Sequence, residues 1–140
     1  MSMILAVLAR RAGVRTATKE VYVSTVGGAR SADPAADLAI AVAVASAAGD
    51  AEFARPVVAL GEVGLSGDVR RVPGVDRRLA EAARLGFEVA LVPVGSVDRH
   101  PVGMKVVEVA TVAQALTLLG VRFRRRQADG ERPQLAVVGR

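Results

Sequence analysis

The stretch GEVGLSGDVRRVPGVDRRLAEAARLG, residues 61–86, predicts a turn from one strand into another, followed by a helix. Gly64 and Gly67 favour a tight hairpin, because glycine takes positive φ without a steric cost. Residues 68–72 would form the return strand, which a Pro-Gly pair ends. Residues 75–85 then carry apolar side chains at helical spacing. The stretch therefore predicts a β-hairpin that leads into an amphipathic helix.

Helices and strands alternate in the rest of the chain. Residues 56–63 are almost continuously apolar, which is typical of a central strand covered on both faces. The chain between Asp37 and Ser46 has no polar side chain, which is typical of a buried helix. Helices are predicted at residues 3–12, 35–48 and 110–119, and further strands at residues 20–26, 88–92 and 105–109. This order predicts an α/β fold, in which helices pack on a mixed sheet with a central hairpin.

Length and composition limit the possible classes of function. The 140 residues suit one domain, predicted at residues 1–120, with a basic and flexible tail at residues 121–140. Only 3% of the residues are aromatic, so base stacking on exposed rings is not expected. Without cysteine and with a single histidine, the chain predicts no metal site of thiolate or multi-histidine type. Its apolar runs are too short to span a bilayer and no secretory signal pattern is present, so we expect a cytoplasmic protein without membrane contact.

Positive charge is concentrated toward the end of the chain. The net charge is +5, of which residues 120–140 contribute +4 and the body of the chain +1. Arginine outnumbers lysine 17 to 2, which fits a GC-rich genome as well as it fits phosphate binding. Within the body, basic residues gather on the return strand and on the helix at residues 75–85, where Glu81 is placed to pair with Arg77 at i,i+4. A solvated helix surface and a phosphate-binding surface both remain open as interpretations.

Candidate catalytic residues have ordinary structural explanations. No G-x-x-x-x-G-K-[ST] loop is present, and the glycines of the opening stretch join two strands rather than a strand and a helix. Ser96, Asp98 and His100 lie in one loop, where three close neighbours rarely converge as a nucleophile set. Glu62, at a strand end, is expected to accept turn hydrogen bonds or to pair with an arginine. Asp37 is expected to act at the positive end of a helix.

Six segments in the same order resemble the C-terminal, Lon-protease-like domain of the RadA (Sms) family of bacterial DNA repair proteins, over residues 4–120. They are ILAVLARRAG, VYVSTVGG, ADLAIAVAVASA, GEVGLSGDVRRV, RRLAEAARLGF and ALVP. The resemblance implies the Lon-protease-like fold, also described as ribosomal protein S5 domain 2-like. Lon-type peptidases use a serine activated by a lysine. In this chain the serine position falls on Ala35 or Ala36, and the lysine position falls on Asp76. Neither residue type supplies that chemistry, so the resemblance implies a domain that is not an enzyme.

In that family, the resemblance implies, the domain serves hexameric ring assembly and DNA binding during homologous recombination and branch migration. The chain would then be an isolated part of a longer protein, with ATP, magnesium and zinc bound only by the other parts and no cofactor here. The expected partners are DNA and further copies of the chain. The expected DNA contacts are Arg30, Arg70, Arg71, Arg77 and Arg78. Two alternatives stay open: a purely structural oligomerisation module that touches no DNA, and a serine peptidase that uses Ser31 or Ser66.

Overall fold

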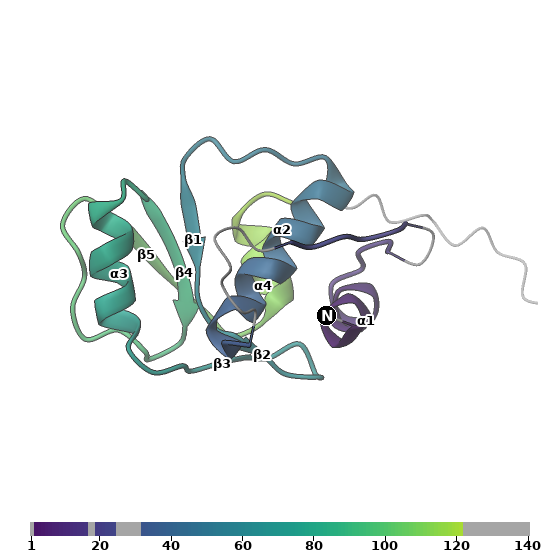
Figure 1. Cartoon of the computed structure of the whole chain (residues 1–140), viewed down its shortest axis with the longest axis horizontal. Coiled ribbons are helices and arrows are strands. Elements are labelled where there is room, and N and C mark those ends of the chain that lie inside the picture. Colours follow the sequence, from purple (N-terminus) through teal and green to yellow (C-terminus); the bar gives the residue numbers. More distant parts are fainter. Residues whose placement is uncertain (1, 17–18, 25–31, 122–140) are drawn as a thin grey trace, which may run out of the picture.

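The protein is described by a computed structural model that covers residues 2–16, 19–24 and 32–121. Figure 1 shows a parallel sheet with helix α3 on one side and helices α2 and α4 on the other, with α1 beyond them. The elements are α1 (Ser2–Arg11), the 3-10 helix η1 (Pro34–Ala36), α2 (Asp37–Gly49), β1 (Val57–Ala59), β2 (Glu62–Val63), β3 (Val69–Arg70), α3 (Val75–Arg84), β4 (Val89–Pro93), β5 (Lys105–Val109) and α4 (Val112–Leu118). The predicted α/β class is confirmed.

The central sheet has the strand order β1-β4-β5, and all its pairings are parallel. Alternate residues of β4 serve two hydrophobic cores, because successive side chains of a strand point to opposite faces. Leu91 belongs to the larger core with α1, α2 and α4, whereas Ala90 and Val92 belong to the smaller core with α3. The continuous apolar character of these strands therefore has the predicted cause, which is burial on both faces.

The hairpin of the opening stretch forms a separate two-stranded ladder. β2 and β3 pair antiparallel, with Glu62 opposite Arg70 and Val63 opposite Val69. Within the turn, the N–H of Gly67 donates to the carbonyl of Gly64 at 2.9 Å. The predicted strand at residues 56–63 is thus divided into β1 and β2, so the parallel and antiparallel pairings occur in two sheets.

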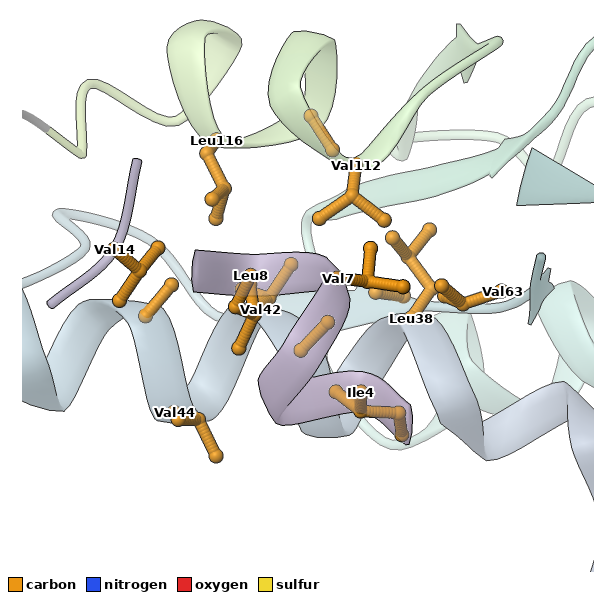
Figure 2. Close-up of a cluster of buried hydrophobic side chains, with 14 of the residues drawn as sticks. Ile4, Val7, Leu8, Val14, Leu38, Val42, Val44, Val63, Val112 and Leu116 are labelled. Carbon is orange, nitrogen blue, oxygen red and sulfur yellow. The ribbon is translucent and has the colours of Figure 1, made fainter. Parts of the chain in front are cut away.

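The helix α2 begins where local capping and a tertiary hydrogen bond coincide. Asp33 Oδ1 accepts from the N–H of Ala35 at 2.9 Å and so caps η1, which runs directly into α2. Asp37 Oδ2 accepts from the N–H of Val63 at 3.2 Å, so this carboxylate ties the start of α2 to β2. The helix buries Leu38 and Val42 in the larger core, beside Leu8 of α1 (Figure 2). The helix at residues 35–48 is therefore confirmed, with its apolar side chains as the main reason for its position.

One predicted strand is wrong over the part that the structure describes. Residues 20–24 are assigned to no strand, and residues 25 and 26 of the prediction lie outside the described ranges. The segment lies beside α2 instead of joining the sheet, and Lys19 Nζ donates to the carbonyl of Ala48 at 3.3 Å. The β-branched residues of this segment favour an extended backbone locally. Strand pairing also requires a neighbouring strand, which the described part of the chain does not place there.

Across residues 2–16, 19–24 and 32–121, the helices fall short of the length and apolarity needed to cross a membrane.

Candidate nucleic-acid interface

The arginines of the hairpin and of α3 differ in whether a carboxylate already neutralises them. Arg70 on β3 donates from Nε to Oδ2 of Asp68 at 2.7 Å. Its Nη1 also lies 3.9 Å from Oε1 of Glu62. Ser66 donates a hydrogen bond to the same Asp68, and this hydroxyl together with Arg70 lowers the pKa of the Asp68 carboxyl. The pairing with Arg70 agrees with the structural role predicted for Glu62. Arg70 is therefore exposed but already paired with two acidic groups.

Arg78 is also paired, and its partner lies far away in the sequence. Its Nη2 donates to Asp33 Oδ2 at 2.8 Å, which connects α3 to the residue that caps η1. Its Nε is buried and makes no hydrogen bond within the described residues. Glu81 pairs with Arg84, at 2.8 and 2.6 Å, and the predicted pairing of Glu81 with Arg77 is therefore wrong. The i,i+3 spacing reaches the same helix face as i,i+4, so sequence spacing did not decide between the two arginines.

Arg71 and Arg77 are exposed, and neither has a carboxylate within 4.0 Å among the residues that the structure describes. Arg71 donates from Nε to the carbonyl of Val94 at 3.1 Å, which orients its guanidinium group without neutralising it. Unpaired guanidinium groups are the side chains best suited to phosphate oxygens. The structure therefore separates Arg71 and Arg77 from the paired Arg70 and Arg78.

The loop between β4 and β5 is held by side chains from neighbouring elements. Asp76 Oδ1 accepts from the N–H of Asp98 at 3.1 Å and from the N–H of Arg99 at 3.3 Å. Glu108 Oε1 accepts from the N–H of Gly95 at 2.8 Å. Asp76, which the sequence analysis predicts only as the position of a missing lysine, therefore anchors this loop.

The anchored loop brings Arg99 and His100 to the first turns of α3. With Asp76, Arg77, Ala80 and Pro101, they line a surface pocket of about 290 Å³. Arg99 was not among the predicted contacts. The order of strands and helices could have predicted that Arg99 lies near α3. In a parallel β-helix-β unit, the start of the helix and the loop after the next strand lie at the same edge of the sheet. Around this loop, the arginines without a carboxylate partner among the described residues are Arg71, which bonds to Val94 at the start of the loop, and Arg77 and Arg99, which line the pocket with His100.

The residues predicted to occupy the serine position of a peptidase, Ala35 and Ala36, are at least half-buried. Ala35 is buried, and its carbonyl accepts from the N–H of Gly61 at 3.0 Å, whereas Ala36 is half-buried. No hydrogen bond joins the side chains of Ser96, Asp98 and His100 within the described residues, and the hydroxyl of Ser96 donates to the carbonyl of Pro93 at 2.6 Å. Arg30, Ser31 and residues 122–140 of the predicted tail lie outside the described residues.

Asp33 gives the ion pair with Arg78 a measurable pH dependence. The N–H of Ala35, and then Arg78, lower the pKa of the Asp33 carboxyl below its ordinary value. A carboxyl with a lowered folded-state pKa stabilises the fold above its unfolded-state pKa of about 3.9, and this contribution is lost as the pH falls through the folded-state pKa. We expect urea midpoints of Asp33→Asn to fall less than those of the wild type between pH 7 and pH 3. Asp98→Asn, at an exposed loop carboxyl, is the control, and equal acid dependence of all three proteins would contradict the assignment.

Comparison with known proteins places this chain in a family. The protein-family model described as "Subunit ChlI of Mg-chelatase" matches residues 6–96. Proteins named "DNA repair protein RadA" are similar over most of the chain: the Mycolicibacterium smegmatis protein is 51% identical over 115 residues, or 82% of this chain and 24% of the relative. The Bacillus subtilis protein is 40% identical over 123 residues, which is 86% of this chain and 27% of the relative. The Escherichia coli protein is 38% identical over 119 residues, which is 84% of this chain and 26% of the relative. The chain spans about a quarter of the length of the curated relatives it matches. The chain therefore belongs to the family that this model defines, and within it to the RadA-type domains.

Proposed function

We propose that this chain is the non-catalytic, DNA-binding domain of a RadA-type DNA repair protein, and that it also takes part in the assembly of a ring. The observation that carries the proposal is the group of exposed arginines, Arg71, Arg77 and Arg99, which has no carboxylate partner in the described structure. Affinity for nucleic acid depends on how many phosphates a protein neutralises, so unpaired cations on neighbouring elements are the relevant feature. The names of the relatives support a role in DNA repair. Homologous recombination and branch migration are the processes that we propose for the complete protein.

The proposal includes no catalytic step for this domain. Ala35 and Ala36 bring no nucleophile, and the carboxylate of Asp76 is engaged by two backbone N–H groups. Ser66 donates a hydrogen bond from its hydroxyl to Asp68 in an exposed turn, and the lowered pKa of Asp68 makes this carboxylate a poor base for activating a serine. A serine-reactive fluorophosphonate is therefore expected to leave the protein unlabelled. In this proposal ATP, magnesium and zinc are bound by other parts of the RadA protein.

A second candidate function, assembly without DNA contact, is favoured by an apolar groove. The groove of about 820 Å³ lies between α3 and the edge strand β1, and Val58, Leu60, Leu85 and Phe87 contribute to its wall. Leu85 is 61% exposed there. Exposed apolar side chains beside an unpaired strand edge are typical of association surfaces. Self-association and DNA binding are compatible, because the groove and the pocket beside the β4–β5 loop share only Arg77 and Ala80.

The decisive experiment is a measurement of solution mass by light scattering, with and without DNA, at about 50 mM and about 200 mM salt. With three phosphate contacts, DNA affinity is expected to fall roughly 20- to 40-fold between these salt concentrations. Salt-sensitive binding supports the DNA-binding role. A stable oligomer that does not bind DNA at the lower salt concentration would replace it with the purely structural function. A monomer that binds DNA would remove ring assembly from this domain.

A further inference from the structure

The pocket at the start of α3 has features of a site for one particular anionic group. It is formed by two elements, with Arg77 from α3 and with Arg99 and His100 from the β4–β5 loop. Its volume of about 290 Å³ is at the lower end of the range for ligand sites, which suits a small group rather than a large ligand. Both arginines and the histidine are exposed, and a ligand therefore reaches them from solvent.

The pocket is built before any ligand arrives. The two hydrogen bonds to Asp76 fix the backbone on which Arg99 and His100 lie, and the hydrogen bond from Gly95 to Glu108 fixes the start of the same loop. A site that is held in place in the free protein loses less conformational entropy on binding. Ligand binding would then restrict the rotamers of the side chains but not the backbone of the loop.

The net charge of the pocket favours an anion. Arg77 and Arg99 contribute two positive charges, and the carboxylate of Asp76 contributes one negative charge. Asp98 lies next to Arg99 in the loop but does not line the pocket. The sum over these three groups is +1, which suits an anion. A free nucleotide or inorganic phosphate carries more charge than a phosphodiester, so its attraction to the two arginines and its repulsion from Asp76 would both be larger. A phosphodiester differs in belonging to a chain whose neighbouring phosphates can meet other cations of the protein.

We infer that this pocket binds one backbone phosphodiester of a nucleic acid, with Arg77 and Arg99 as its charged donors and His100 as a further donor. The inference rests on the proposed DNA-binding function and specifies where one phosphate is held. Guanidinium groups from two elements would approach the two non-bridging oxygens from different sides. The contact carries no base specificity, because it is made to the backbone alone.

The single histidine makes occupancy of the pocket directly observable, because its imidazole gives one unambiguous set of NMR signals. Titration with a short oligothymidine is expected to shift these signals together with the amide of Arg99. Inorganic phosphate and ATP, added at equal concentration, are expected to give smaller shifts. Larger shifts with ATP than with DNA would overturn the phosphodiester assignment. DNA binding, seen by light scattering, without shifts at His100 and Arg99 would overturn the pocket and leave the proposed function standing.

A charge-matched pair of variants provides the quantitative test. Arg99→Gln is expected to weaken DNA binding about tenfold and to reduce the salt slope by about 1, the signature of one lost phosphate contact. Arg55→Gln is the control, because it removes the same charge from a residue that pairs with Glu88 at 3.4 Å. Equal losses in the two variants would show a general charge effect and contradict the pocket. If the wild type binds no DNA at low salt, the proposed function fails, and shifts at His100 with phosphate alone would then reassign the pocket to a free anion.

Discussion

Replacing Arg71 and Arg77 together with glutamine is expected to weaken DNA binding roughly 100-fold at low salt. Both guanidinium groups are exposed, and neither has a carboxylate within 4.0 Å in the described structure, so both are available to phosphates. A hydrogen bond to a charged group contributes about 1.5–3 kcal/mol, or about tenfold or more in affinity for each arginine. The salt slope is expected to fall by about 2, and the loss to be similar for all DNA sequences. Fluorescence anisotropy at several salt concentrations measures both quantities.

The matched control is the double variant Arg55→Gln, Arg84→Gln. It removes the same two charges, but Arg55 pairs with Glu88 and Arg84 pairs with Glu81 at 2.6 Å. The carboxylates beside these arginines weaken their attraction for a phosphate. Their replacement also leaves Glu88 and Glu81 without an ion-pair partner. A loss of affinity well below that of the first pair is expected. If both pairs lose affinity equally, net charge rather than the arrangement around the β4–β5 loop governs binding. Thermal melts of both variants should match the wild type, because all four arginines are exposed.

Gly61→Ala is expected to lower the free energy of unfolding by about 2–6 kcal/mol. The residue has φ of 149°, which side chains with a Cβ rarely adopt, and this costs about 1–3 kcal/mol. A Cβ here would lie 2.6 Å from Cγ1 of Val69 and 3.3 Å from Cγ of Pro93, which adds an overpacking cost of about 1–3 kcal/mol. The backbone has little freedom to move aside, because its N–H and carbonyl both bond to the segment around η1 at 3.0 Å. Urea unfolding followed by circular dichroism measures the change.

Gly86→Ala separates the two costs. Gly86 also has positive φ, at 90°, but a Cβ there meets no atom within 4 Å. This variant is expected to lose only the backbone contribution of about 1–3 kcal/mol. If Gly61→Ala is no more destabilising than Gly86→Ala, the close packing of the hairpin against the sheet at Gly61 is not a source of stability.

The hairpin and helix of the opening stretch were predictable because their signals are local. Turn glycines and helical periodicity act over a few residues, and both elements occur where the pattern places them. The strand at residues 20–26 was wrong over its described part because a strand also needs a partner, which no local pattern supplies. The division of residues 56–63 at Gly61 was missed for a related reason. An uninterrupted apolar run does not reveal where the chain leaves one sheet for another.

For this protein, sequence alone was sufficient for the α/β class and for the resemblance to RadA domains, and the absence of the peptidase residues at Ala35, Ala36 and Asp76 stays a prediction from that resemblance. These conclusions depend on residue type and order along the chain. Only the tertiary structure decided which arginines are paired. Arg78 meets Asp33 across 45 residues of sequence, and Asp76 holds a loop 22 residues away. Charge neutralisation depends on distances of a few ångströms in space, and sequence separation does not report those distances.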